Sequence, residues 1–440
     1  MWTVIGFVLF LLALLFSIAW HELGHLSFAK LYNVRTTQYM VGFGKTLWSK
    51  QVGETEYGFK AVPLGGYIRM VGMVPPGKDG RQKVTTTAMG VTGMFRNIVE
   101  ETRAGDRSQV SPEDEGRQFY QLHPAKRIVV MMAGPVMNLI LAVGIFGVLL
   151  VGIGVPTQST TVATVSQCVI PAAAAGTAQR TECTASDPQT PAALAGLLPG
   201  DTIVGFNGTA VTDWNQLTDL IRASAGETVE LEYIRDGQQV TAAVPIVRTQ
   251  RPVIDGSGQQ IGVAPAGFLG ISVTAPYVAQ SVGAAIGRTG DFIGAAAKAV
   301  VAIPARIPAL WDAIFSDTPR DLDSPVGIVG AGRIGGEILE SDSTSTTDKW
   351  VLFLNLVAGF NMSLFLLNML PLLPLDGGHI LGAIIEWVRR GWASVRKKPD
   401  PGPFDVAKLM PIGYVVALLF IGLTALTLIA DVVNPVKLFG

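Results

Sequence analysis

Four long apolar stretches of this 440-residue chain contain no charged residue, and they constrain its fold more than any other feature. A helix needs about 20 predominantly apolar residues to span a bilayer. The four stretches that meet this requirement are 2–20, 128–155, 350–375 and 410–430. Only 15% of the chain is charged, against about 25% in soluble domains. We therefore predict an α-helical membrane protein with four transmembrane helices.

The first apolar stretch resembles a secretory signal peptide in length, but it lacks a basic n-region and a small-residue cleavage site. We expect it to remain as a transmembrane helix. Lys and Arg number 33 and Asp and Glu number 34, so no global basic field favours nucleic acid as a partner. The lipid bilayer is the partner that the composition predicts.

The charges of the connecting segments predict the orientation of the chain. Residues 26–127 carry 15 basic against 9 acidic residues, and residues 376–409 carry 6 against 4. Residues 156–349 carry 11 basic against 19 acidic residues. Because cytoplasmic loops are enriched in Lys and Arg, we expect the first and third segments inside the cell. The acidic segment and both termini then lie outside.

The outer segment contains a predicted soluble domain. Alternating apolar residues at 202–206 and 228–234 indicate strands, turn residues follow each of them, and 213–223 has a helical apolar pattern. The run AALAGLLPGDTIVGFNG, with the later helix and strands, resembles a PDZ domain, an α+β fold that binds peptides by adding a strand to its sheet. Cys168 and Cys183 both face outward in this topology, where a disulfide is favoured over free thiols.

The predicted organisation has seven parts. They are a first transmembrane helix with HExxH (1–27), a cytoplasmic segment with a re-entrant β-hairpin and a flexible polar loop at 74–120 (28–127), a second transmembrane helix (128–155), an extracytoplasmic PDZ-like domain (156–279), an amphipathic interfacial segment (280–349), a third transmembrane helix with LDGG (350–379), and a cytoplasmic segment with the fourth helix (380–440). We expect the interfacial helix to be broken at Pro304 and Pro308.

The sequence HELGH at the inner end of the first span is the first candidate for chemistry. His21 and His25 stand four residues apart on one helical face, a spacing that can hold one metal ion. Catalytic zinc takes three protein ligands and an open position for water, and Glu22 is placed to act as general base. HExxH alone is a weak signal, and a His-Glu-His cluster that snorkels at a helix end is the alternative. Ionisable residues at membrane depth nevertheless favour a functional site.

A third ligand must come from elsewhere in the chain. The inner end of the third span reads NMLPLLPLDGGH, in which Asp376 is the natural candidate and His379 competes with it. The prolines of this stretch interrupt the helix, and freed backbone groups at membrane depth are tolerated only in packed protein or beside a wet cavity. The alternative is an ordinary helix exit with a turn at 376–378. Both motifs fall on the same inner membrane face, which favours a shared site.

Together, HELGH, NMLPLLPLDGG and an outer PDZ-like insertion resemble the bacterial site-2 proteases of the RseP type, nearly end to end. The resemblance implies one Zn²⁺ held by His21, His25 and Asp376, Glu22 as the residue that activates water, and Asn368 as a residue that helps to hold the substrate. It also implies a multi-pass protein of the bacterial inner membrane. The family cuts transmembrane helices, often of anti-sigma factors after a site-1 protease has removed the outer domain. AGPVMNLILA in the second span resembles the family's AGPxxN stretch.

The segment 56–70 predicts a β-hairpin, because it is rich in aromatic and β-branched residues, with Gly65 and Gly66 as its turn. It resembles the family's re-entrant hairpin, whose edge would receive an extended substrate beside Gly65, Gly66 and Tyr67. The alternative is a cytoplasmic hairpin that only packs on the membrane surface. For the whole chain, a zinc intramembrane endopeptidase is the leading interpretation. A metal transporter and a catalytically inert PDZ scaffold are the alternatives.

Overall fold

The structure is a computed structural model, and it describes residues 2–76, 110–173, 180–254, 260–316, 320, 324–342 and 344–436. The chain divides into two compact units. Unit 1 combines Met1–Leu149 with Val282–Gly440, and unit 2 is Leu150–Ser281. Unit 1 is therefore a helical body into which unit 2 is inserted.

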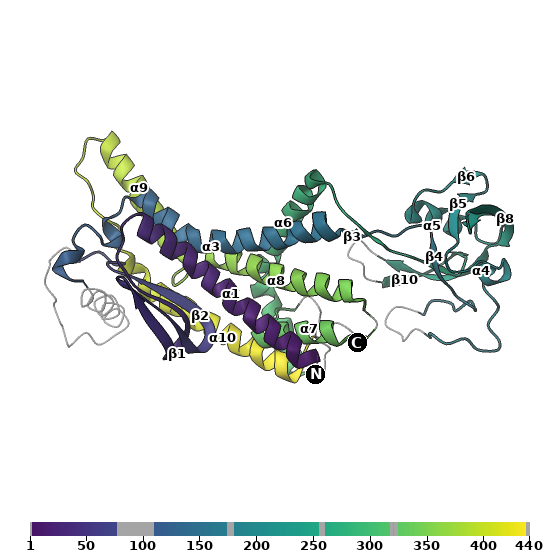
Figure 1. Cartoon of the computed structure of the whole chain (residues 1–440), viewed down its shortest axis with the longest axis horizontal. Coiled ribbons are helices and arrows are strands. Elements are labelled where there is room, and N and C mark those ends of the chain that lie inside the picture. Colours follow the sequence, from purple (N-terminus) through teal and green to yellow (C-terminus); the bar gives the residue numbers. More distant parts are fainter. Residues whose placement is uncertain are drawn as a thin grey trace. The chain divides into compact units, whose positions relative to one another are not determined.

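Long helices make up most of unit 1 (Figure 1). They are α1 (Trp2–Leu31), α3 (Pro124–Gly147, continued by the π-helix Val148–Ile153), α6 (Val282–Phe315), α7 (Ile328–Glu340), α8 (Thr346–Asn368), α9 (Asp376–Val395) and α10 (Met410–Val433). Among the described residues, five helices are long and apolar enough to cross a membrane. Four of them, α1, α3, α8 and α10, overlap the predicted spans, and the fifth is α6.

Close helix packing in unit 1 depends on glycine. α7 lies along the first half of α1, and a Cβ added to Gly336 would come within 2.6 Å of the Thr3 carbonyl oxygen. α3 packs against α1, α8 and α9. At Gly24 of α1, an added Cβ would overlap the backbone of Ala133 in α3. The bundle therefore brings α1 and the start of α3 into backbone contact.

Prolines have different effects within α6 and after α8. α6 continues through Pro304 and Pro308, so the predicted break is wrong: each proline removes only one N–H donor, and the helix runs on across that loss. α8 ends at Asn368, and residues 369–375 form a loop before α9 begins at Asp376. The LDGG stretch therefore starts a separate helix and does not continue the third span.

The β-hairpin consists of β1 (Thr36–Val52) and β2 (Thr55–Met70). Its turn is at residues 53–54, so the predicted turn at Gly65 and Gly66 is wrong. Both glycines lie inside β2, and Gly66 pairs with Val41 of β1. A Cβ at Gly66 would come within 2.9 Å of Ile18 Cγ2 in α1. Glycine is needed there because the strand passes close to the helix, which is a common reason for glycine inside a strand.

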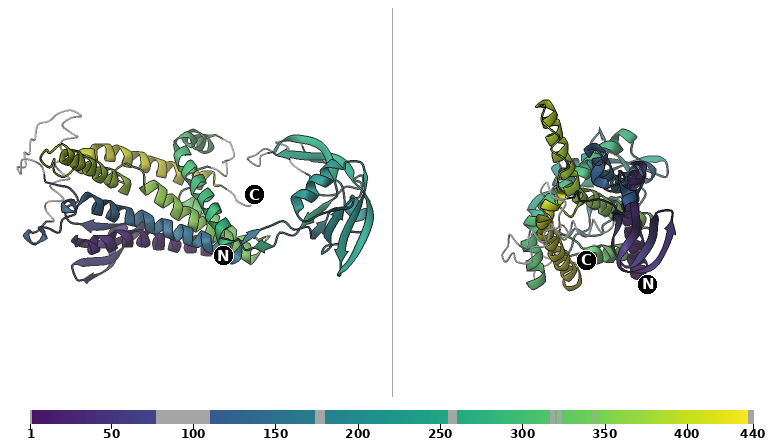
Figure 2. Two further views of the ribbon diagram at one scale, coloured as in Figure 1. Left: turned by 90° about the horizontal axis from the view of Figure 1, so that it is seen from above. Right: turned by 90° about the vertical axis from the view of Figure 1, so that its left-hand side faces the viewer.

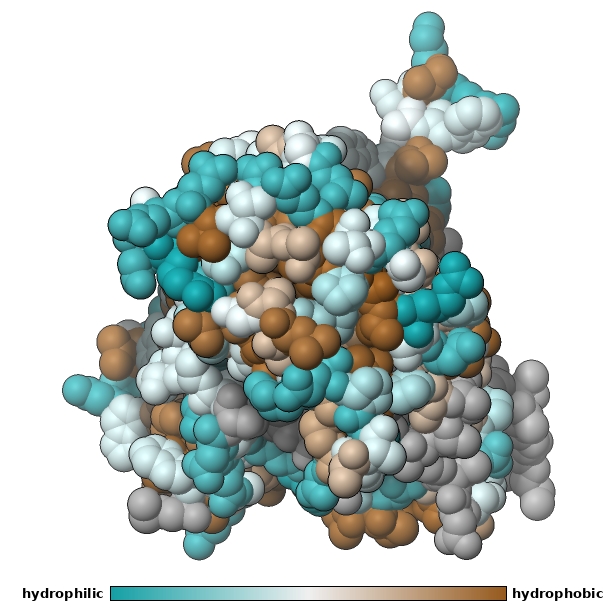
Figure 3. Space-filling view, turned by 90° about the vertical axis from the view of Figure 1, so that its right-hand side faces the viewer, coloured by the Kyte–Doolittle hydropathy of each residue, from teal (hydrophilic) through white to brown (hydrophobic). Residues whose placement is uncertain are grey.

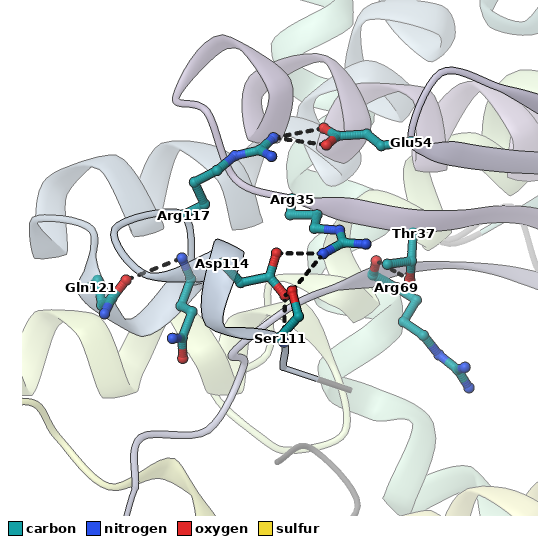
Figure 4. A network of polar contacts seen from close by, with 9 residues as sticks. Arg35, Thr37, Glu54, Arg69, Ser111, Asp114, Arg117 and Gln121 are labelled. Carbon is teal, nitrogen blue, oxygen red and sulfur yellow. Dashed lines mark hydrogen bonds and ion pairs between the residues drawn. The ribbon is translucent and has the colours of Figure 1, made fainter. Parts of the chain in front are cut away.

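The polar segment predicted as a flexible loop at 74–120 lies mostly outside the described residues, which resume at residue 110. Its last part folds into two 3-10 helices, Pro112–Asp114 and Phe119–Gln121. Arg35 donates to the buried Asp114 at 2.6 Å, and Arg117 donates to Glu54 at 2.8 Å (Figure 4). These contacts attach the segment to the start and the turn of the β-hairpin.

Unit 2 contains short strands and two short helices around its own core. The strands are β3 (Val155–Pro156), β4 (Val162–Val165), β5 (Thr202–Phe206), β6 (Thr209–Ala210), β7 (Thr228–Arg235), β8 (Gln238–Pro245), β9 (Val247–Ile254), β10 (Gln260–Phe268), β11 (Ile271–Val273) and β12 (Tyr277–Val278). The helices are α4 (Pro191–Leu194) and α5 (Trp214–Ala223). The main sheet has the order β6-β5-β7-β8. The predicted strands and helix correspond to β5, β7 and α5.

Turn residues of unit 2 occupy the conformations that the sequence suggests. Asp236 and Gly237, between β7 and β8, both have positive φ values, as do Asn207 and Gly208 between β5 and β6. Two such residues in succession match the twist of the flanking strands in a tight hairpin.

Cys168 and Cys183 form a disulfide. Polar and apolar side chains are interspersed on the face of the molecule that Figure 3 shows.

Candidate metal centre

Three ionisable residues of α1 converge on one buried position in unit 1. His21, Glu22 and His25 are all less than 10% exposed, although α1 is otherwise free of charge until Lys30. The helical spacing places the two imidazoles on one face, with Nε2 atoms 3.1 Å apart. Glu22 is adjacent, and the backbone N–H of Ile68 in β2 donates to its carboxylate.

Asp376 joins the two histidines from the first turn of α9. Its Oδ2 lies 3.2 Å from Nε2 of His21 and 3.3 Å from Nε2 of His25. Gly377 and Gly378 allow the loop before α9 to pack against the start of this helix. A side chain at either residue would overlap the backbone of that loop, at Leu370 and Leu373. The LDGG glycines therefore serve close packing of the loop on α9, and the predicted alternative of a turn at 376–378 is wrong.

The three atoms fit a zinc ion. Ligand atoms about 2.0–2.1 Å from a tetrahedral Zn²⁺ are about 3.3–3.4 Å apart, and the observed separations of 3.1, 3.2 and 3.3 Å approach those values. Asp376 Oδ2 is buried and accepts no hydrogen bond, which is costly unless a cation lies beside it. Within the described residues, these three side chains form the one group of His, Cys, Asp or Glu that could hold a metal.

Helix α3 contacts both imidazoles on the side away from this position. Nδ1 of His25 lies 2.8 Å from the carbonyl oxygen of Val130, and Nδ1 of His21 lies 3.2 Å from Nδ2 of Asn138. A side chain at Gly134 would overlap the ring of His25. α3 therefore contacts both rings at Nδ1 and also passes close to the Nε2 edge of His25 at Gly134, while both Nε2 atoms lie near Asp376.

A cavity of about 390 Å³ opens beside the triad. It is lined by the triad and by residues from the strand edge, α3, α8 and the loop before α9: Ile18, His21, Glu22, His25, Gly65, Gly66, Tyr67, Ile68, Met70, Met73, Met131, Asn138, Leu364, Asn368, Pro374, Asp376 and His379. All the residues that the sequence predicted for substrate binding therefore lie along one space. His379 lines it as well, but does not belong to the metal-ligand group.

Sequence reasoning missed the parts of α3 that touch the histidines. The AGPxxN resemblance marked Gly134 and Asn138, but gave neither of them a role. Val130 contributes only a carbonyl oxygen, so no side-chain pattern could have indicated it. Ile68 is a similar case, because a backbone N–H is what reaches Glu22.

Comparison with known proteins identifies the family of this chain. The sequence model of peptidase family M50 matches residues 9–399. The chain belongs to peptidase family M50. Zinc metalloprotease Rip1 of Mycobacterium tuberculosis is 36% identical over 99% of both chains, and Rip1 of Mycolicibacterium smegmatis is 34% identical over 99% of both. Metalloprotease MmpA of Caulobacter vibrioides is 26% identical over 92% of this chain and 91% of its own.

A PDZ domain of the SdrC-like protein from Listeria monocytogenes covers 19% of this chain and 76% of its own, at 27% identity and a TM-score of 0.14, too low for any conclusion about the fold. Family M50 is the site-2 protease family, so the protein is a zinc-dependent intramembrane metalloprotease and a multi-pass membrane protein whose substrates are membrane proteins. The predicted enzyme class and cofactor are confirmed. The transporter and the inert scaffold are not supported.

Proposed function

We propose that this protein cleaves transmembrane helices of single-span membrane proteins, with zinc held by His21, His25 and Asp376 and with Glu22 as general base. The observation that carries this proposal is the convergence of three ligand atoms within 3.3 Å of one another, beside a buried carboxylate and a cavity. The three ligands come from two segments more than 350 residues apart in the chain. Such a convergence indicates a built site and not a helix end that happens to carry histidines.

Each residue then has a distinct role. Bound Zn²⁺ polarises a carbonyl and lowers the pKa of water, which supplies the electrophile and the nucleophile of hydrolysis. Glu22 accepts the proton of the attacking water and later delivers it to the leaving amine. The N–H of Ile68 orients the Glu22 carboxylate. Burial of Glu22 excludes bulk water, so few other bases can replace it.

The edge of β2 is a suitable place for the substrate. A protease cannot reach carbonyls that are locked in a helix, so the substrate must unwind, and pairing with a strand edge would satisfy its freed backbone groups. Residues 66–69 pair with β1 along one edge of this stretch. Gly65, Gly66 and Tyr67 also line the cavity. Asn368 at the end of α8 lines the same cavity, where its amide could bind substrate backbone.

The active site lies toward the cytoplasmic end of the bundle in this proposal. α1 and α8 run toward the cavity, since His21 and Asn368 lie late in each helix, and α3 runs away from it. The charge bias of the loops supports a cavity end that faces the inside of the cell. Both termini and unit 2 then lie outside.

The directions of α3 and α8 also indicate whether α6 crosses the membrane. α3 ends, and α8 begins, on the side of the bundle opposite the cavity, so the chain between them crosses the membrane an even number of times. Two well-separated positions of α6 meet residues on that side: Phe292, in its first half, stacks on Phe146 near the end of α3, and Asn434, after α10, donates to the carbonyl of Ala313 near the end of α6. α6 runs across the direction of α3 and α8 in two views (Figures 1 and 2). These observations support an interfacial helix in place of a fifth span.

Unit 2 is proposed to be a PDZ-like domain that restrains access of substrates with bulky outer domains. Its four-stranded sheet, the helix α5 and the two tight hairpins support that assignment. A site-1 protease would first remove the outer domain of the substrate. Anti-sigma factors are the substrate class that the family resemblance suggests, in the bacterial inner membrane.

Cleavage of a single-span helix by purified protein tests the proposal. A fluorogenic or gel-resolved substrate in detergent or vesicles should be cut by the zinc-loaded protein, and chelation should stop the cut. Variants His21→Ala and Asp376→Ala should lose both zinc and cleavage. Retention of stoichiometric zinc by either variant would exclude that residue from the ligand set.

A further inference from the structure

The second span contains a polar residue at membrane depth that the reaction itself does not use. Asn138 is fully buried in the middle of α3, its Nδ2 lies 3.2 Å from Nδ1 of His21, and its Oδ1 has no hydrogen-bond partner. A buried amide oxygen without a donor is costly. A 180° flip of an Asn amide exchanges the positions of Oδ1 and Nδ2, and the hydrogen-bond partners decide which of the two positions is favoured.

The proposed ligand set decides between the two positions. When His21 binds zinc through Nε2, the neutral ring carries its proton on Nδ1 and can only donate there. Nδ2 of Asn138 is also a donor, so two donors would face each other at 3.2 Å. With the amide flipped, Oδ1 accepts the Nδ1–H of His21. This arrangement gives Oδ1 a donor and leaves the Nε2 lone pair free for the metal.

The second histidine provides an internal comparison. Nδ1 of His25 faces the carbonyl oxygen of Val130 at 2.8 Å, which can only accept. Both acceptors therefore belong to α3, one turn on either side of Gly134, whose missing side chain lets α3 reach the rings. Metal-bound imidazoles usually donate their other N–H to such an acceptor, and this fixes both tautomer and ring orientation.

We infer that Asn138 is a positioning residue of the zinc site, whose side-chain oxygen holds His21 in the tautomer and orientation that bind metal. This inference rests on His21 being a ligand through Nε2, as proposed above. It gives the AGPVMN stretch a structural role, in which Gly134 admits the helix, Val130 orients His25 and Asn138 orients His21.

Zinc affinity of the purified full-length protein, measured by competition with a chromophoric chelator, tests the inference without reference to cleavage. Asn138→Leu keeps the branched shape of the side chain but offers no acceptor, so its zinc affinity should fall about 10–100-fold. Asn138→Asp restores an acceptor and should bind zinc within about threefold of the parent, or more tightly. Asn361→Leu is the matched control, because Asn361 is also fully buried, also contacts α1 through Ser17, and also has an Oδ1 without a partner.

Three outcomes would overturn the inference: parental affinity in Asn138→Leu, an equal loss in Asn361→Leu, or a failure of Asn138→Asp to restore binding. The ligand set is tested separately with His21→Ala, which should lose tight zinc binding by itself. In that background, Asn138→Leu should cause no further loss. Tight binding by His21→Ala would show that the ligand set is wrong, whereas the Asn138 results concern only how His21 is held.

Discussion

His21 and Glu22 are adjacent in α1 but contact different neighbours, so their roles differ. His21 faces Asp376 and His25, whereas the carboxylate of Glu22 accepts the N–H of Ile68 at the strand edge. Glu22 therefore stands between the metal position and the strand edge beside which the substrate is proposed to lie. A base in that position can reach both the attacking water and the leaving amine.

Replacement of Glu22 with Gln should abolish cleavage and preserve the metal. Gln keeps the size and a polar side chain but cannot accept a proton, so the rate should fall by about 10²–10⁴-fold or more. Zinc content should stay at about one per chain, because Glu22 is not among the three converging ligand atoms. Cleavage by the reconstituted variant is measured beside metal analysis, with His21→Ala as the control that loses zinc. Activity within a few-fold of the parent would exclude Glu22 as the base.

Asp376 and His379 differ by three residues in the chain and should differ in their effect on zinc. Asp376→Ala removes one of three converging ligand atoms, so zinc content after dialysis should drop well below one per chain. His379→Ala should retain zinc, since His379 lines the cavity without joining the triad. Metal analysis of both purified variants decides the matter. Loss of zinc in His379→Ala alone would move the third ligand to His379.

The residues that side-chain patterns could indicate were found in the sequence, and those that act through the backbone were not. His21, Glu22, His25 and Asp376 stand in recognisable motifs, and the structure brings them together. The N–H of Ile68 follows from how β2 approaches α1, which is a property of tertiary packing. Periodicity and composition carry no information about such a contact.

At the scale of elements, the close approach of strand β2 to α1 constrains the site. A Cβ at Gly66 would come within 3.0 Å of Cγ of Glu22 and within 3.0 Å of the carbonyl oxygen of Met40. The sequence suggested a turn here, because consecutive glycines are common in turns. The sequence pattern did not indicate the turn at 53–54. The two glycines allow β2 to contact α1 instead.

Gly66→Ala should therefore impair cleavage more than it impairs folding. The added methyl group must displace either the strand edge or Glu22, and a misplacement of about 1 Å can cost about 10²-fold in rate. Zinc binding should remain close to parental, since the three atoms nearest to the added Cβ belong to Ile18, Glu22 and Met40 and not to a proposed ligand. Gly144→Ala in α3 is the matched control, because nothing lies within 4 Å of its added Cβ. Equal cleavage by both variants would show that the strand edge tolerates displacement.

The start of β5 in unit 2 is held by an ion pair whose effect depends on pH. Asp201 is buried and accepts from Nε and Nη2 of Arg235 at 2.8 and 2.7 Å, and from the N–H of Leu198 at 2.8 Å. These hydrogen bonds, the one from Arg235 first, hold the pKa of Asp201 below its ordinary value. A lowered pKa means that the ionised form stabilises the folded state.

The stability from Asp201 should be present in full above the unfolded-state pKa of about 3.9 and disappear as pH falls through the lower folded-state pKa. Asp201→Asn should lower the thermal midpoint of unit 2 by about 5 °C at neutral pH and should flatten its dependence on acid pH. Limited proteolysis of the full-length protein at graded temperature and pH reports unit 2 directly. An unchanged acid dependence in the variant would remove Asp201 as its source.

On the scale of the whole molecule, the sequence predicted a body of long apolar helices, because long apolar stretches are a local signal. Two other features depend on packing: the course of α6, for which the predicted break was wrong, and the pairing of the ends of unit 2, for which no sequence pattern led to a prediction. α6 runs unbroken through its prolines, and β4, near the start of unit 2, pairs with β11 near its end. The paired ends show that unit 2 extends well beyond the first alternating strands recognised in the sequence.

The ends of unit 2 also define a clean deletion. The N–H of Ser159 donates to the carbonyl of Thr274 at 2.9 Å, so these two residues lie side by side and residues 160–273 can be replaced by a short Gly-Ser linker. Unit 2 has a hydrophobic core of its own, and all three zinc ligands belong to unit 1. The deleted protein should therefore insert, bind about one zinc and cleave a pre-trimmed single-span helix at a rate close to the parent.

A substrate that retains its bulky outer domain should now be cleaved as well, whereas the parent should cleave it slowly. The comparison of both substrates on both proteins tests the filter role, with Glu22→Gln in the deleted protein as the inactive control. A deleted protein that holds zinc but still rejects the bulky substrate would show that discrimination lies in unit 1.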